Sequence, residues 1–334
     1  MRKKIILLVF AVILLLPLGT QQASAASVLY GADGSGNNPS TLYTINTLTG
    51  AALPVGAGIG FSSCGAMDFH PVLGILYAIC KDATGANVLI TINHITGIGA
   101  LVAPVTGSII TSGQLGNGGV MDVSFRNIVD NTLYVTTFVT PSGGGASLEL
   151  HTINIGNGIS AFVGLTTRTA PGNGIAFSAG DTLFHIDQQD FNFLNQVTGA
   201  ATTIGFGIPH IPPSGNARDN AMDFEPGTGI LFSSTNEALL SGGGGPNFLS
   251  TVDTATGFVT IVGQTVNGLD AIAFLAQCPP GQGGFPDCSP LVAGSLIPID
   301  TTMVLVAGAQ STSAWMIPVI VSAIGIGIVI ARKF

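Results

Sequence analysis

One phrase recurs five times along this chain, about fifty residues apart. It is a short strand-like run followed by a turn that contains Gly, and it alternates with a second phrase of the type Met-Asp-Phe. Self-similarity at this period is the signature of a β-propeller, in which each repeat forms one four-stranded blade. The first phrase occupies residues 42–50, 89–97, 150–158, 191–199 and 249–257, and the second occupies 67–69, 121–123, 175–177, 222–224 and 272–274.

The second repeat shows how each blade is expected to fold. Period-2 alternation and turn residues predict four antiparallel strands, at residues 66–69, 75–79, 88–93 and 100–103, running from the central channel to the rim. The hairpins between third and fourth strands close on glycines, which take a positive φ without strain, at Gly50, Gly97, Gly199 and Gly257.

The two ends of the repeat region complete one blade between them. Residues 27–31 match a second strand, 74–78, but no first strand precedes them, whereas residues 269–274 match a first strand that nothing follows. Joining the two closes the ring and removes an open sheet edge. We therefore predict an all-β fold, a five-bladed β-propeller over residues 27–275. A sixth blade would require strands hidden in loops 103–119 or 205–220.

The chain ends carry targeting signals. A basic stretch, an apolar run and Ala23-Ser24-Ala25 predict a cleaved signal peptide. A second apolar run, residues 314–331, would span about 27 Å as a helix, which is enough for a bilayer core. Basic residues follow it, and because such residues stay on the cytoplasmic side, the large domain is expected outside the cell. The expected domains are a signal peptide (1–26), the propeller (27–275), a Pro/Gly-rich stalk (276–313), a transmembrane helix (314–331) and a cytoplasmic tail (332–334).

Charge restricts the partners. Only 8% of residues are charged, and residues 26–313 hold four basic groups and all seventeen acids, a net of 4 − 17 = −13. Such a surface repels phosphate, so nucleic acid is not expected as a partner. We expect a single-pass protein of the cell membrane with an extracellular propeller and a protein or glycan partner.

Loop lengths divide the two faces of the predicted disc. Because the strands alternate in direction, loops between first and second strands and between third and fourth strands share one face, and they are uniformly short. The remaining loops share the other face and are long and varied, which is typical of binding surfaces on rigid scaffolds. Candidate ligand-contacting residues on this long-loop face are His210, Arg218 and Asp219.

Three aspartates recur in the innermost strands. Asp68, Asp122 and Asp223 each alternate with apolar neighbours, so they should face the channel. Carboxylate oxygens suit a hard cation such as calcium, which makes the three a candidate metal site. The alternative is structural: each carboxylate accepts hydrogen bonds from loop amides and stabilises a blade junction.

Four cysteines follow the signal peptide. The hairpin centred near residue 72 sets Cys64 opposite Cys80, a spacing that allows a cross-strand disulfide, and Cys278 and Cys288 bracket a ten-residue stretch. Secretion favours disulfides over metal thiolates. Sequence alone leaves the other two pairings open.

No sequence signal marks an enzyme active site. The five histidines form no spaced pair and are interpreted as surface residues, and no metal motif or nucleophile elbow is present. No catalytic residue and no cofactor other than calcium is predicted.

The repeats resemble those of secreted propeller proteins of the YVTN and NHL-like kind. The resemblance is carried by Leu-Tyr pairs at 29–30, 76–77 and 133–134, by the Thr-Gly hairpins and by the Asp-Phe pairs at 68–69 and 223–224. The tail 299–334 is similar to the C-terminal anchors of archaeal surface proteins. The resemblance implies a surface protein for binding, adhesion or envelope structure. The alternative is a metal-dependent hydrolase or lactonase-like propeller enzyme with a channel cation.

Overall fold

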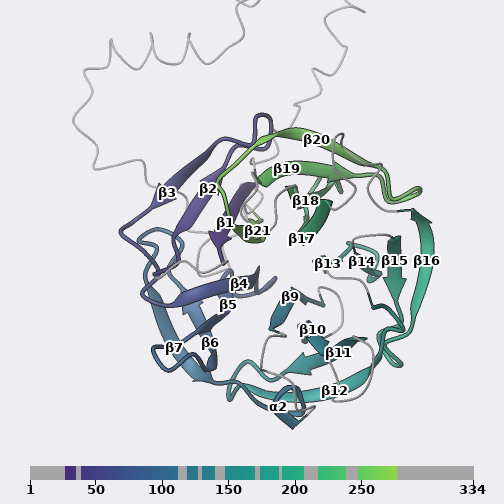
Figure 1. Cartoon of the computed structure of the whole chain (residues 1–334). Helices are drawn as coiled ribbons and strands as arrows, with labels where there is room; N and C mark the ends of the chain where they lie inside the picture. Colours follow the sequence, from purple (N-terminus) through teal and green to yellow (C-terminus); the bar gives the residue numbers. More distant parts are fainter. Residues whose placement is uncertain are drawn as a thin grey trace, which may run out of the picture. The chain divides into compact units, whose positions relative to one another are not determined.

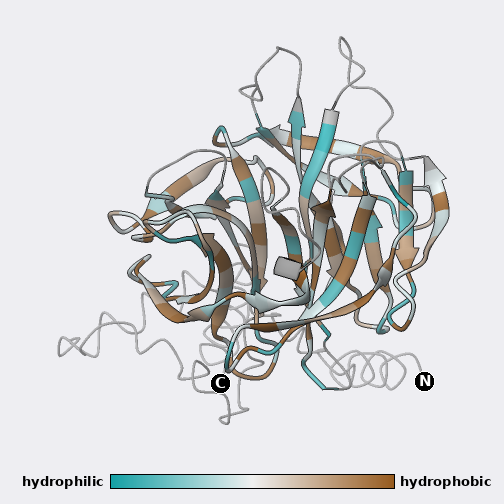
Figure 2. Cartoon of the chain, turned by 60° about the horizontal axis from the view of Figure 1, so that its bottom comes forward, coloured by the Kyte–Doolittle hydropathy of each residue, from teal (hydrophilic) through white to brown (hydrophobic). Residues whose placement is uncertain are grey.

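The computed structural model describes residues 27–34, 39–111, 119–126, 130–139, 147–169, 174–187, 190–206, 217–237 and 247–276. Five antiparallel sheets surround a central axis, with one strand of each sheet innermost and one on the rim (Figure 1). The predicted all-β, five-bladed propeller is therefore confirmed. Cartoon ribbons coloured by hydropathy show polar and apolar residues alternating along many strands (Figure 2).

Each blade is numbered here by its place in the chain, and its strands are given from the channel to the rim. Blade 1 has β21 (Leu269–Leu275), β1 (Val28–Asp33), β2 (Leu42–Ile45) and β3 (Ala52–Val55), and blade 2 has β4 (Ser62–Phe69), β5 (Leu76–Lys81), β6 (Asn87–Ile92) and β7 (Gly99–Pro104). Blade 3 has β9 (Val120–Phe125), β10 (Leu133–Val139), β11 (Ser147–Ile153) and β12 (Ile159–Leu165). Blade 4 has β13 (Gly174–Phe177), β14 (Leu183–Ile186), β15 (Asp190–Leu194) and β16 (Ala201–Phe206), and blade 5 has β17 (Ala217–Phe224), β18 (Leu231–Glu237), β19 (Asn247–Val252) and β20 (Val259–Gln264).

The ring closes within blade 1, as the two sequence fragments predicted. Strand β21, from the end of the repeat region, pairs antiparallel with β1, from its beginning, in a register that sets Phe274 opposite Leu29 and Ala273 opposite Tyr30. Closure therefore uses backbone hydrogen bonds between residues more than two hundred positions apart.

An aromatic side chain recurs at one register of the second strand in every blade. The Leu-Tyr pairs that the sequence shows in blades 1 to 3 have Leu-Phe equivalents in blades 4 and 5. Apolar clusters join residues of neighbouring blades, so the core lies mainly between blades. The recurring aromatic residues are Tyr30, Tyr77, Tyr134, Phe184 and Phe232.

Glycines fasten the rim. The hairpin glycines Gly50, Gly97, Gly199 and Gly257 have φ between 73° and 77°, as their position predicts. A second set of glycines, in or next to the rim strands, touches the Thr-Gly turn of the following blade so closely that an added Cβ would overlap the threonine carbonyl. These contacts are Gly56 with Thr96, Gly164 with Thr198, Gly205 with Thr256 and Gly263 with Thr49.

The loop after blade 2 adds short elements rather than a blade. It forms β8 (Thr106–Gly107), which pairs parallel with β12 at the edge of blade 3, and the single-turn helix α2 (Ser108–Thr111). The segment 205–220 is described only in part.

The expected signal peptide, transmembrane helix and Cys278–Cys288 pair lie outside the described residues. Within the described part of the chain, no helix is long and apolar enough to cross a membrane.

Candidate functional site

The three predicted aspartates lie on inner strands, but not at one register. Asp68 in β4 pairs opposite Tyr77, and in blade 3 the residue opposite the equivalent Tyr134 is Ser124. Asp122 therefore lies two residues before the register of Asp68, rather than at that register as the sequence repeat implied. The repeated phrase misled because residues 121–123 copy its letters without copying its register.

The carboxylates of Asp68 and Asp223 accept hydrogen bonds from backbone amides of their own blade and of a neighbouring blade. Asp68 accepts hydrogen bonds from the N–H groups of Phe69 and of Phe125 in blade 3, both at 2.7 Å. Asp223 likewise accepts from Phe224 in its own strand at 2.7 Å and from Phe274 in blade 1 at 2.5 Å. These donors belong to strands rather than to loops, and each carboxylate links two blades.

Asp122 links three blades. One carboxylate oxygen accepts from Val123 N at 2.9 Å, and the other accepts from Ile175 N in blade 4 at 2.9 Å and from Met222 N in blade 5 at 3.2 Å. Its side chain is fully buried. A single carboxylate therefore ties together the inner strands β9, β13 and β17.

The three carboxyl groups are close enough to affect one another. Burial raises the pKa of Asp68 to about 7. Burial also raises the pKa values of Asp122 and Asp223 well above the ordinary range, and the charge of Asp68 raises both further. The structure thus brings the three predicted residues near enough for the charge of Asp68 to disfavour ionisation of the other two.

Among the described residues, no group of three or more His, Cys, Asp and Glu side chains could hold a metal ion. The hydrogen bonds of the channel carboxylates agree with the structural alternative. The calcium site stays a prediction.

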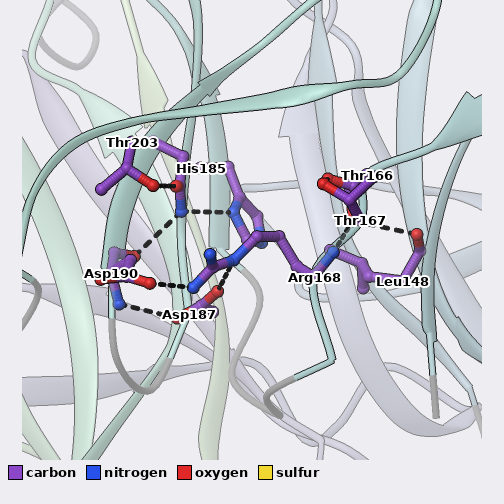
Figure 3. A network of polar contacts seen from close by, with 9 residues as sticks. Leu148, Thr166, Thr167, Arg168, His185, Asp187, Asp190 and Thr203 are labelled. Atoms are coloured by element: carbon purple, nitrogen blue, oxygen red, sulfur yellow. Dashed lines mark hydrogen bonds and ion pairs between the residues drawn. The ribbon is translucent and has the colours of Figure 1, made fainter. Parts of the chain in front are cut away.

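A second polar network joins blades 3 and 4 on the long-loop face (Figure 3). Arg168, which follows β12, pairs with Asp187, just after β14, at 2.7 Å and with Asp190, the first residue of β15. Burial alone would lower the pKa of Arg168, but hydrogen bonds and the charges of the two aspartates outweigh it and raise the pKa. The network links the end of β14 and the start of β15 to the preceding blade.

His185 lies beside the same network. It is fully buried, and burial lowers its pKa to about 4, although the charge of Asp187 opposes this shift. Its Nδ1 lies 3.4 Å from the Asn192 amide, while its buried Nε2 has no hydrogen-bond partner among the residues that the structure describes. His185 is therefore not the surface residue that the sequence suggested.

The predicted loop residues Arg218 and Asp219 lie inside strand β17, and His210 lies outside the described residues. Asp219 is fully buried and accepts hydrogen bonds from Ser233 at 2.9 Å and Thr235 at 2.5 Å. Burial raises its pKa to about 6. This arrangement makes Asp219 an internal polar group of blade 5 rather than an exposed contact.

A third polar cluster, which sequence reasoning missed, lies between blades 2 and 3. Ser108 Oγ is 2.9 Å from His151 Nδ1, and His151 Nε2 is 2.9 Å from Glu149 Oε2. His151 is fully buried, whereas Ser108 is partly exposed. The spacing of 149 and 151 places both side chains on one face of β11, but nothing in the sequence indicates that Ser108 meets them.

One disulfide lies on the long-loop face. Cys64 in β4 and Cys80 in β5 are bonded, as the hairpin geometry predicted. It ties the loop that enters blade 2 to the loop between β5 and β6.

Comparison with known proteins supports the fold only. No protein-family model and no curated protein matches the chain. Similar solved structures include a candidate 6-phosphogluconolactonase from Bacteroides uniformis (TM-score 0.39, 12% identity, covering 72% of this chain and 82% of that one). TolB from Acinetobacter baumannii is also similar (TM-score 0.42, 11% identity, covering 75% of this chain and 67% of that one). Similarity this low carries no argument about activity.

Proposed function

We propose that this protein is a cell-surface propeller, anchored by its C-terminal segment, that binds a protein or glycan partner through its long-loop face. The supporting observation is the contrast between the two faces. All five hairpins between third and fourth strands are built alike. In each, a side-chain oxygen of Asn or Asp accepts hydrogen bonds from one or two of the following backbone amides, and a glycine with positive φ closes the turn. A turn repeated in this way serves the fold and offers no feature that would distinguish one ligand from another.

The contacts that hold the opposite face differ between blades 2 and 4. In blade 2 a disulfide joins β4 to β5, and Asp82 organises an exposed turn by accepting hydrogen bonds from Thr84 N at 2.8 Å and Ala86 N at 3.0 Å, whereas in blade 4 Arg168 pairs with Asp187 and Asp190. Individually fastened loops on a common scaffold are what a binding surface requires.

A crosslinking experiment tests the proposal. The full chain would carry a photo-crosslinking residue in place of exposed Thr84 on the long-loop face or, as the matched control, in place of Ile95, which is 75% exposed in a hairpin of the other face. We expect specific adducts with surface components of the source cells at position 84 only. Equal adducts at both positions, or none at position 84, would contradict a binding role for this face.

Metal analysis separates the proposal from the rival metal-dependent hydrolase. A stoichiometric metal in the purified full chain would favour the hydrolase or a cation site in the channel. A metal-free protein that still captures a partner would favour binding.

A further inference from the structure

The loop that follows blade 2 places a hydroxyl against a histidine and a carboxylate. Ser108 Oγ, His151 and Glu149 form one continuous chain of hydrogen bonds, each 2.9 Å long. A carboxylate only accepts hydrogen bonds, so contact with Glu149 favours the tautomer with the proton on Nε2. The lone pair of Nδ1 then points at the Ser108 hydroxyl, which is the arrangement of an activated nucleophile.

We propose that Ser108 is a nucleophile for acyl transfer, with His151 as its general base and Glu149 as the residue that positions the imidazole. The substrate class is a carboxylic ester. This activity is independent of partner binding on the long-loop face.

Three observations favour this role over a purely structural one. The first is that the propeller does not need a polar pair here. The equivalents of His151 and Glu149 in blade 2 are Ile90 and Val88, which fill the same register with apolar side chains. Burying a histidine and a glutamate between blades carries a desolvation cost that blade 2 avoids at this register.

The second observation is that another side chain fastens the insertion. Ser160 Oγ donates to Thr106 O at 2.6 Å and accepts from Ile109 N at 3.0 Å, and the apolar side chain of Ile109 packs between the blades. Ser160 therefore fastens α2 at two points besides its longer contact with Ser108, whose Oγ lies 3.4 Å from Ser160 Oγ and 2.9 Å from His151 Nδ1.

The third observation concerns access and protonation. Ser108 is partly exposed, while the imidazole behind it is fully buried. Burial lowers the pKa of His151, opposed by its hydrogen bond to Glu149, so the ring is neutral and can accept a proton near pH 7. Phe162, 52% exposed, packs edge-on against the ring with centroids 5.4 Å apart and supplies an apolar wall beside it.

The reaction balances with water as the second substrate. Ser108 Oγ attacks the ester carbonyl carbon and its proton passes to His151 Nδ1, which returns it to the departing alkoxide. Water then attacks the acyl-serine ester and gives its proton to the same nitrogen, which delivers it to Ser108 Oγ as the carboxylic acid leaves.

A fluorophosphonate probe tests the proposal on the purified full chain, with peptide mass spectrometry to locate the adduct. We expect an adduct on Ser108 that forms about 100-fold faster than one on Ser62, a partly exposed serine whose hydroxyl contacts only the Lys81 carbonyl oxygen among the described residues. Hydrolysis of p-nitrophenyl acetate should follow the same site.

Two variants separate nucleophile from scaffold. Ser108→Ala should lose the adduct and the esterase rate, whereas Ser62→Ala should keep both. The pair Glu149→Val with His151→Ile copies the residues of blade 2, so it should fold as well as wild type while labelling of Ser108 falls about 100-fold. No adduct on Ser108 in the wild-type chain, or equally fast labelling in the double variant, would overturn the proposal.

Discussion

The channel carboxylates predict an unusual dependence of stability on pH. Asp68 is 9% exposed, and burial raises its pKa from 3.8 to about 7. Between these two values the folded protein holds a proton that the unfolded chain has lost. The free energy of unfolding must therefore fall as pH rises through this interval, the opposite of the usual behaviour of a paired carboxylate.

The magnitude follows from the size of the shift. The difference of 7 − 3.8 is about three pKa units, and each unit corresponds to about 1.4 kcal/mol. Asp68 should therefore cost the folded state about 4 kcal/mol above pH 7, a cost that disappears as pH falls toward 4.

His185 masks this effect in the wild-type protein. Burial lowers its pKa from 6.5 to about 4, so the unfolded chain takes up a proton first as pH falls below 6.5. This lowers stability over nearly the same interval in which Asp68 raises it. The test must therefore compare variants at each pH, because groups on which Asp68 has no influence cancel in the difference, and the change that remains belongs to Asp68 together with the two carboxyl groups that its charge affects.

Asp68→Asn replaces the ionisable carboxyl group with an amide of nearly the same shape, which does not titrate. Urea denaturation at constant ionic strength, from pH 4 to pH 9, should show the variant gaining on wild type by about 4 kcal/mol as pH rises. The loss of one hydrogen bond to Phe125 or Phe69 adds an offset that does not vary with pH. A constant difference between the two proteins, or one that changes in the other direction, would refute the reasoning.

Other predictions concern single contacts. Cys80→Ser opens a loop that separates its ends by 16 residues and should lower the free energy of unfolding by about 3 kcal/mol in non-reducing urea, with no further loss in Cys64→Ser/Cys80→Ser. Gly164→Ala places a methyl group on the next blade and should destabilise by about 1–3 kcal/mol, whereas Gly119→Ala, which has open space, should be near neutral; equal effects would remove the rim-contact argument. Arg168→Met leaves a buried carboxylate without its cation and should cost about 3–5 kcal/mol in the same assay, and a smaller loss at pH 7 would mean that the ion pairs stabilise little. Calcium held by the channel aspartates would raise the melting temperature and a chelator would lower it; an unchanged midpoint with both would end the calcium hypothesis.

Repetition made the architecture predictable. Five copies of one phrase fixed the number of blades, and two unmatched fragments at the ends located the closing blade, because a strand without a partner must find one. The Cys64–Cys80 bond was predictable for a similar reason, since a short hairpin sets the opposing positions.

Register and burial limited the prediction of sites. Asp122 appeared to repeat Asp68, but the two differ in register by two residues. Such a shift moves a side chain along the strand while it still points to the same face of the sheet, so the alternation of polar and apolar residues could not reveal it. His151 was assigned to the surface because the five histidines form no spaced pair, whereas in the structure its ring is buried and contacts Ser108 and Glu149. Contacts across 43 residues, such as that of Ser108 with His151, leave no periodic trace in a sequence.

Closure by β1 and β21 also orders events during biosynthesis. Among the described residues, β1 is synthesised first, yet it is the second strand of its blade, and its inner neighbour β21 ends at Leu275. Blades 2 to 5 each have their own four strands in continuous order, whereas blade 1 stays incomplete until almost the whole described chain has been made. A nascent chain stopped before residue 269 would leave one edge of β1 unpaired. The ring can therefore close only after the last described strand has been made.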